Sequence, residues 1–246
     1  GGPVLTAGGT GSHHVVAAAV HARRLGLDIE AVQYPQPDSD DVEHTRTTLT
    51  RLGGIATTAA PSPYVMPAVL AARLAALASK RPYLLWPGAS TPLGALGHVS
   101  AGLELAAAMD EEPDDVVVAL GSGGTAVGLA LGLALAGWRS ATVVGVRVAD
   151  AVANNRLVLA ALGAGTSALL TLGGAVPRPG RLTIDARWFG AGYGHPSAAG
   201  DAATERAAAL GLELEPTYTA KAFAAALDRV DRGRRVVFVQ TFAGLQ

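Results

Sequence analysis

The stretch VVVALGSGGTAVGLALGLAL, residues 116–135, constrains the fold more than any other part of the sequence. Its first five residues are all apolar, glycine and serine fill positions 121–124, and a run rich in alanine and leucine follows. A strand without polar alternation is typical of a parallel sheet whose two faces are both covered by helices. The stretch therefore predicts an α/β fold in which a glycine turn leads from a buried strand directly into a helix.

The same alternation runs along the rest of the chain. We expect two three-layer α/β/α domains with mostly parallel sheets, divided somewhere between residues 87 and 115 and placed as 1–95 and 96–246. Strands are predicted at 4–6, 29–34, 55–59, 83–86, 116–120, 141–148, 182–188 and 236–241. Helices are predicted at 15–25, 40–52, 64–79, 93–109, 125–136, 151–162, 197–210 and 219–230, with a looser segment at 163–180.

Composition excludes several classes of function. Half of the residues are hydrophobic, 16% are charged and the formal net charge is −1, which argues against disorder and against nucleic-acid binding. Cysteine is absent, so disulfides, thiolate nucleophiles and cysteine-zinc sites are excluded, and a cytoplasmic location is favoured. Apolar runs such as 125–138 are shorter than about 20 residues, so no membrane span is predicted. The chain begins with Gly-Gly-Pro, and we expect a processed, trimmed or partial chain.

Three glycine-rich turns, at 6–14, 86–94 and 120–128, are predicted to lie at the carboxyl ends of strands, where α/β proteins bind ligands. The third is the sharpest, because its glycines let backbone N–H groups converge on an anion while Ser122 and Thr125 add hydroxyl donors. A phosphate is the expected ligand. Two alternatives remain: tight turns without a ligand, or a dinucleotide site of the G-x-G-x-x-A type, for which only Asp150 is placed to hold a ribose.

Two adjacent histidines, His13 and His14, follow Gly11 and Ser12 in the first turn. Neighbouring side chains at a helix start point in different directions, and no carboxylate or cysteine motif supports them, so no metal site is expected. A Ser-His nucleophile pair is unsupported for the same geometric reason. An anion-binding helix start that accepts a substrate carboxylate explains the glycines and Ser12 best.

Six segments, taken together and in this order, resemble one family of pyridoxal-phosphate enzymes. They are TAGGTGSHHVVAAAVHARRLGL, PGASTPLGALGHVSAGLEL, GSGGTAVGLALGL, FGAGYGHPS, EPTYTAKAFAAAL and VVFVQTFAGL. The family comprises 1-aminocyclopropane-1-carboxylate deaminase and D-cysteine desulfhydrase, within the tryptophan-synthase-β-like fold, also called fold type II. The resemblance covers essentially the whole chain and implies a homodimer with pyridoxal 5'-phosphate as cofactor.

The resemblance implies a role for each matching residue. The smaller domain would be mobile and the larger one would bind the cofactor. Substrate would be bound by Gly11, Ser12, His13 and His14, and Ser12, Tyr193 and Tyr218 would serve catalysis. Cofactor would be held by Gly121, Ser122, Gly123, Gly124 and Thr125 at the phosphate, Tyr218 at the ring, Thr219 or Thr241 at the ring nitrogen, and His13 at the phenolic oxygen, where the family has asparagine. Each tyrosine also has a purely structural alternative as a packed aromatic.

The family's Schiff-base lysine has no counterpart in this sequence. Lys80 and Lys221 are the two lysines, and Lys221 matches the Tyr-Thr-Gly-Lys turn of the family, for which we expect a structural or charge role. We expect that the N-terminal part of the large domain, with that lysine, is missing from the sequence. The implied reaction is deamination or elimination on a small amino acid, as in D-cysteine desulfhydrase or 1-aminocyclopropane-1-carboxylate deaminase, giving ammonia and a 2-oxo acid. The alternative is a lysine-less, catalytically impaired homologue that only binds cofactor or ligand.

Overall fold

A computed structural model describes residues 2–53, 55–178 and 180–241. The chain divides between Ala89 and Ser90 into two compact units, Gly1–Ala89 (the first unit) and Ser90–Gln246 (the second unit). Each unit holds one four-stranded parallel sheet between layers of helices. The predicted fold class, two three-layer α/β/α domains, is confirmed.

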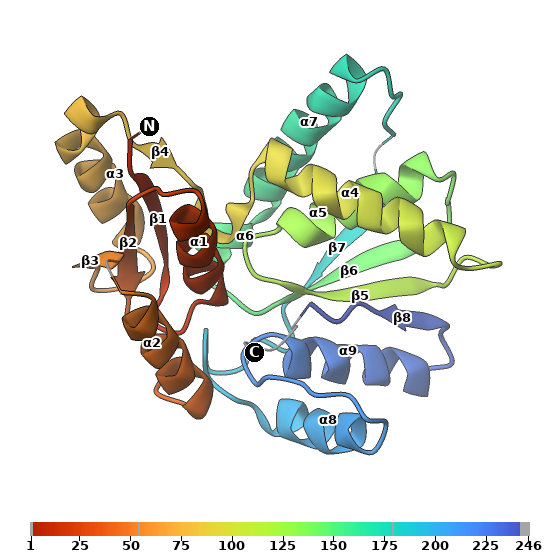
Figure 1. Cartoon of the computed structure of the whole chain (residues 1–246). Helices are drawn as coiled ribbons and strands as arrows, with labels where there is room; N and C mark the ends of the chain where they lie inside the picture. Colours follow the sequence, from red (N-terminus) through yellow and green to blue (C-terminus); the bar gives the residue numbers. More distant parts are fainter. Residues whose placement is uncertain (1, 54, 179, 242–246) are drawn as a thin grey trace. The chain divides into compact units, whose positions relative to one another are not determined.

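The first unit is built on the sheet β3-β2-β1-β4, whose neighbouring strands are all parallel. Helices α1 and α2 cover one face, and α3 covers the other (Figure 1). Its elements are β1 (Val4–Gly9), α1 (His13–Arg24), β2 (Ile29–Tyr34), α2 (Asp40–Leu52), β3 (Ile55–Ala59), α3 (Met66–Ala76), the 3-10 turns η1 (Ala78–Lys80) and η2 (Pro87–Ala89), and β4 (Tyr83–Leu84).

The second unit is built on the parallel sheet β7-β6-β5-β8. Alternate residues of β5 face opposite layers, so Val116 and Val118 pack under α4, α5 and α7, while Val117 packs under α8 and α9 (Figure 1). The elements are α4 (Pro92–Ala107), β5 (Asp115–Leu120), α5 (Gly124–Leu135), β6 (Thr142–Arg147), α6 (Ala151–Asn154), α7 (Arg156–Leu172), β7 (Leu182–Asp185), α8 (Ala198–Ala208), α9 (Thr219–Asp231) and β8 (Val236–Phe238).

Local sequence signals place most element ends. The predicted helix 40–52 matches α2, because the Ser39 hydroxyl accepts a hydrogen bond from the Val42 N–H and Gly53 ends the helix with a φ of 61°. Several predicted strands are too long: β7 ends at Asp185 rather than at 188, and β8 ends at Phe238 rather than at 241. The predicted division of the chain at 95 and 96 falls inside α4.

The predicted loose segment at 163–180 is largely wrong, because α7 continues through Gly163 and Gly165 to Leu172. A Cβ atom at Gly165 would lie 2.6 Å from the Pro92 Cγ, so this glycine permits close packing of α7 on α4 rather than ending the helix. The same device brings α4 and α5 together, since a Cβ at Gly132 would lie 2.2 Å from the Val99 carbonyl oxygen. These glycines act on packing, not on turns.

The two units share a strand order. Numbered within each unit, the strands run 3-2-1-4, so the order reverses between the first and fourth strands of each sheet. Ligands of open parallel sheets bind at such a switch point, outside the carboxyl ends of the strands. In both units the glycine-rich turn follows the first strand, β1 or β5, and therefore lies at the switch point.

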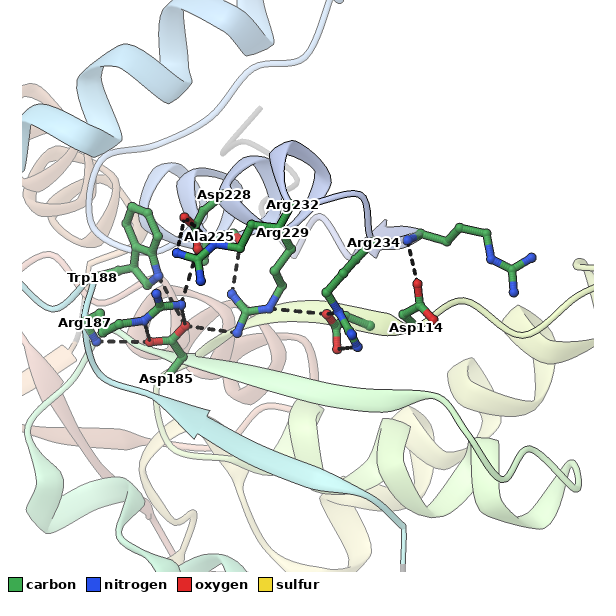
Figure 2. A network of polar contacts seen from close by, with 11 residues as sticks. Asp114, Asp185, Arg187, Trp188, Ala225, Asp228, Arg229, Arg232 and Arg234 are labelled. Atoms are coloured by element: carbon green, nitrogen blue, oxygen red, sulfur yellow. Dashed lines mark hydrogen bonds and ion pairs between the residues drawn. The ribbon is translucent and has the colours of Figure 1, made fainter.

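An ion-pair network fixes α9 to the sheet of the second unit (Figure 2). The Arg229 guanidinium reaches the Asp185 carboxylate at the end of β7 (3.0 Å) and the Asp115 carboxylate at the start of β5 (3.5 Å). Arg187 and Arg234 add further contacts to these two carboxylates. Burial opposes ionisation of Asp185, but the hydrogen bonds from Arg187 and Arg229 outweigh it and hold the pKa of this carboxyl well below its usual range.

Within the described part of the chain, one segment, Ala151–Leu172, is long and apolar enough to cross a membrane by length and composition, with a mean hydropathy of 1.3 over its most apolar 18 residues. The chain bends within it, because Asn155 has extended backbone angles and separates α6 from α7. The buried residues Leu159 and Leu162 of α7 pack into the core under α5. We therefore interpret α7 as a helix of the outer layer of the second unit.

Candidate functional site

The loop between β5 and α5, called the anion loop below, is a candidate anion site formed by backbone N–H groups. Gly123 is the N-cap of α5 and has a φ of 100°, a conformation that glycine adopts without strain. In the described part of the chain, the N–H groups of Ser122, Gly123 and Thr125 donate to no protein acceptor. Unpaired N–H groups at the positive end of a helix dipole attract a negatively charged group. The first turn of α5 carries no acidic residue that would oppose this.

Side chains from α4 and from the turn before it form hydrogen bonds with residues of this loop. The Ser90 hydroxyl lies 2.7 Å from the Ser122 hydroxyl and accepts a hydrogen bond from the Gly124 N–H (3.0 Å). The His98 Nε2 lies 3.3 Å from the Thr125 hydroxyl. Burial lowers the pKa of His98, so this imidazole is neutral near pH 7.

Asn154 supports the start of the loop through hydrogen bonds to its backbone. It is fully buried, and the two hydrogens of its side-chain NH2 group are shared among the carbonyl oxygens of Leu120 (3.2 Å), Gly121 (2.8 Å) and Ala149 (3.1 Å). Its carbonyl oxygen accepts from the Arg147 Nε (2.9 Å). These four contacts connect the end of β5 with the end of β6, and they hold the first residue of the anion loop, Gly121, in place.

Two predicted tyrosines meet beside the loop. The Tyr193 and Tyr218 hydroxyls lie 2.6 Å apart, and the two rings pack edge to face with centroids at 6.0 Å. A Cβ atom at Gly121 would lie 3.5 Å from the Tyr218 Cε1, so the ring of Tyr218 lies against the start of the loop. The structure thus brings the predicted residues Gly121–Thr125, Tyr193 and Tyr218 into one region of the second unit.

The two predicted partners of the cofactor ring nitrogen lie in different settings. The Thr219 hydroxyl accepts from the Glu215 N–H (2.9 Å) and donates within the same turn to a Glu215 oxygen. The Glu215 carboxylate also accepts from the N–H groups of Thr217, Tyr218 and Thr219, and so caps the start of α9. Thr241 is exposed and lies three residues beyond the end of β8.

The glycine-rich turn of the first unit is a second helix start without a side-chain cap. Ser12 is the N-cap of α1 and is buried, and its hydroxyl makes no capping bond. The Gly11 N–H donates to the Gln36 side chain (3.0 Å). The Thr10 hydroxyl is buried and has no hydrogen-bond partner among the described residues. An orphaned hydroxyl in a helix-start turn favours a bound polar group there.

The adjacent histidines of this turn contact different partners. The His13 Nε2 lies 2.9 Å from an Asp41 carboxylate oxygen. The His14 Nε2 lies 2.8 Å from the Thr6 hydroxyl, which itself donates to the Leu85 carbonyl oxygen. Since that hydroxyl has one hydrogen, it accepts from the His14 Nε2–H. Burial lowers the pKa of His14 to about 4, so its ring is neutral at pH 7.

The two lysines have unlike environments. Lys80 is exposed at the end of η1 in the first unit. Lys221 is fully buried in α9, and its Nζ donates to the carbonyl oxygens of Phe189 (2.9 Å) and Gly192 (3.1 Å). Among the described residues, no group of three or more His, Cys, Asp or Glu side chains is arranged to hold a metal ion.

Ser90, His98 and Asn154 contact the loop but are not among the site residues predicted from the sequence. The sequence does carry a signal for Ser90, because this residue lies in the second glycine-rich turn, which is predicted to lie at the carboxyl end of the sheet. His98 and Asn154 carry no such signal, since their roles arise from the packing of α4 on α5 and from the short helix α6. The remaining predicted site residues of the first unit, Gly11 to His14, do share one turn.

Comparison with known proteins agrees with this geometry. The family model described as pyridoxal-phosphate dependent enzyme matches residues 1–241. D-cysteine desulfhydrase of Salmonella schwarzengrund is 34% identical over 241 residues, covering 94% of this chain and 71% of that protein. The Klebsiella pneumoniae D-cysteine desulfhydrase is also 34% identical, covering 97% of this chain and 75% of its own length.

Solved structures share this fold. A crystal structure described as an ACC deaminase homologue superposes with a TM-score of 0.77 at 26% identity, covering 97% of this chain and 73% of its own. Threonine deaminase isoform 2 of Solanum lycopersicum, with a TM-score of 0.61 at 16% identity over 99% of this chain and 70% of its own, shares the fold. The family match favours pyridoxal 5'-phosphate over a dinucleotide as the cofactor. The chain therefore belongs to the family of pyridoxal-phosphate dependent enzymes, with relatives named D-cysteine desulfhydrase.

Proposed function

We propose that the chain is a pyridoxal-phosphate dependent lyase or deaminase that releases ammonia and a 2-oxo acid from a small amino acid. D-cysteine and 1-aminocyclopropane-1-carboxylate are the proposed substrates, because the relatives carry the names of enzymes for these two compounds. The observation that carries the proposal is the set of three unpaired N–H groups at the start of α5. Such a set suits the dianionic phosphate of the cofactor.

The residues of the β5–α5 loop fit the cofactor's phosphate. The N–H groups of Ser122, Gly123 and Thr125 are open to an anion, and the Ser122 and Thr125 hydroxyls are further donors. The ring of Tyr218, which lies against Gly121, would support the cofactor ring. When bound, the cofactor withdraws electrons from the α-carbon of an amino acid, which makes bonds to that carbon easier to break.

The protein's own groups would orient the substrate and handle a proton. The Tyr193 and Tyr218 hydroxyls share a short contact, so one phenol donates to the other and the pair can hold a proton at a defined oxygen atom. In the first unit, Ser12 and the buried Thr10 hydroxyl stand at an uncapped helix start that suits the substrate carboxylate. His14 is neutral there and so adds no cation of its own.

Thr219 and Thr241 both remain proposals for the partner of the ring nitrogen. A neutral nitrogen needs a hydrogen-bond donor, and the Thr219 hydroxyl hydrogen is directed at Glu215. Thr219 would therefore have to release Glu215 in order to donate to the ring. Thr241 is exposed and is under no such constraint within the described residues.

A reversible cofactor binder without turnover is the second candidate, and one observation favours it: the buried ammonium of Lys221 is already engaged by two backbone carbonyls. The test is to supply the purified protein with pyridoxal 5'-phosphate, dialyse it with and without borohydride, and assay ammonia and 2-oxo acid from each proposed substrate, with L-cysteine as control. Turnover supports the enzyme. Bound cofactor without turnover supports the binder, and a protein that binds no cofactor contradicts both.

We further propose a homodimer in the cytoplasm, which the resemblance to the deaminase and desulfhydrase family and the absence of cysteine suggest. Light scattering of the purified protein tests the assembly. A mass equal to that of one chain would contradict the dimer.

A further inference from the structure

Among the described residues, Lys221 is the largest fully buried side chain, and no carboxylate pairs with it at ion-pair distance. Its Nζ instead donates to two backbone carbonyl oxygens, those of Phe189 and Gly192, and lies 5.7 Å from the centre of the Phe189 ring. Burying an ammonium is costly unless it is well hydrogen-bonded. A buried ammonium held by two carbonyl oxygens is therefore expected to have a specific structural role.

The segment that Lys221 holds is the glycine-rich connection from β7 to α8. Three of its glycines, Gly190, Gly192 and Gly194, have φ values of 66°, 138° and 78°. Glycine loses the most conformational freedom when it is ordered, so such a segment needs external contacts to keep one shape. Two backbone hydrogen bonds within or next to it are long, from the Phe189 N–H to the Ala186 carbonyl oxygen and from the His195 N–H to the Gly192 carbonyl oxygen, both at 3.3 Å.

Tyr193 directly follows one of the two held carbonyls. Its hydroxyl meets that of Tyr218, which lies three residues before Lys221 at the start of α9. Residues three apart on a helix lie on the same face. The first turn of α9 therefore contacts the glycine-rich segment in two places. The Lys221 ammonium donates to its backbone carbonyls, and the Tyr218 hydroxyl contacts the Tyr193 hydroxyl.

We propose that Lys221 is a positioning residue whose ammonium fixes the Phe189 and Gly192 carbonyls so that the Tyr193 hydroxyl is held against that of Tyr218. Lys221 touches neither substrate nor cofactor in this role and acts through Tyr193. The proposal rests on the proposed function in one respect, namely that the tyrosine pair faces the reacting groups.

The first test is hydrogen exchange of the segment 189–195 in Lys221→Met, with Lys80→Met, an exposed lysine, as matched control. Methionine keeps the length and the apolar stem but removes the three donors. We expect exchange in 189–195 to rise about tenfold or more in Lys221→Met, with the centre of α9 unchanged, and no change in Lys80→Met. Unchanged exchange in 189–195 would overturn the proposal, whether or not the protein turns over any substrate.

The second test is a double-mutant cycle on turnover with Lys221→Met and Tyr193→Phe. If the lysine acts through Tyr193, each single variant lowers kcat by about ten- to a hundredfold with little change in KM, and the double variant is no worse than Tyr193→Phe alone. Additive losses would overturn the proposal. Should Lys221→Met fail to fold, Lys221→Gln, a shorter and uncharged side chain, replaces it with the same expected rise in exchange at 189–195. Lys221→Arg, which keeps a charged donor, is expected to retain most of the exchange protection. Absence of turnover in the unmodified protein contradicts the proposed function and leaves the exchange test decisive for the lysine.

Discussion

At the scale of single residues, Ser122 and Thr125 carry the most direct prediction. Their hydroxyls are donors at the anion loop, and a hydrogen bond to a charged group contributes about 1.5–3 kcal/mol. Ser122→Ala and Thr125→Val should each weaken binding of pyridoxal 5'-phosphate by about ten- to a hundredfold. Thr171→Val is the matched control, because that hydroxyl only donates to a carbonyl within α7. Equilibrium titration of the cofactor measures the affinities, and equal affinities in all three variants would contradict the assignment.

His14 predicts a pH dependence of the first unit. Its pKa is lowered from 6.5 to about 4 by burial, so the unfolded chain binds a proton more readily than the folded one. The stability of the first unit should therefore be complete above pH 6.5 and fall as the pH drops toward 4, by up to about 3 kcal/mol. Hydrogen exchange of β1 and α1 measures this. His14→Gln, which does not titrate, should remove most of the dependence between these pH values, and an unchanged slope would refute the prediction.

At the scale of elements, Asn154 is predicted to support the loop between β5 and α5. Asn154→Ala removes a hydrogen-bond partner from three carbonyl oxygens and from the Arg147 side chain, and a buried polar group left unpaired costs about 1–3 kcal/mol. We expect weaker cofactor binding as well as lower stability.

The neighbouring residue is the matched control for this prediction. Asn155 caps α7 through the N–H groups of Leu157 and Val158 and does not contact the loop. Asn155→Ala should cost about 1 kcal/mol and leave the affinity for cofactor unchanged. If both variants weaken cofactor binding equally, Asn154 has no specific role in shaping the loop.

The attachment of α9 to the sheet depends on Arg229. Arg229→Met removes contacts to the buried carboxylates of Asp115 and Asp185, each of which keeps another arginine, so we expect a loss of about 2 kcal/mol in urea denaturation. Arg232→Met, which removes an exposed pair with Asp228, should cost less than about 0.5 kcal/mol.

The pH dependence of stability shows in which direction the effect of Arg229→Met should change. Asp185 has a lowered pKa, so its contribution is present above the unfolded value of 3.8 and is lost as the pH falls below it. The difference between Arg229→Met and the unmodified protein should therefore shrink below pH 4. A difference that stays constant down to pH 3 would contradict the role of this carboxylate.

At the scale of the whole molecule, more of the fold than of the candidate site could be predicted from the sequence. Apolar strands and capped helices are local signals, so β2, β3 and α2 have the predicted bounds. The continuation of α7 could not be predicted, because Gly165 serves contact with Pro92, a residue far away in sequence.

The same reasoning explains the site. Residues inside a motif, such as Ser122 or Tyr218, are visible in the sequence, and the structure brings Tyr193 to Tyr218 although 25 residues separate them. Asn154 and His98 act through elements packed behind the loop, and no local pattern reports such packing. The roles assigned to the predicted site residues themselves remain predictions.

The central claim is that the N–H groups at residues 122, 123 and 125 bind the phosphate of pyridoxal 5'-phosphate. A crystal structure of the protein with this cofactor tests it most directly. We predict phosphate oxygens within hydrogen-bond distance of these three N–H groups and of the Ser122 and Thr125 hydroxyls. A phosphate bound at another place would contradict the account, if the loop then contacted Ser90 but no phosphate oxygen.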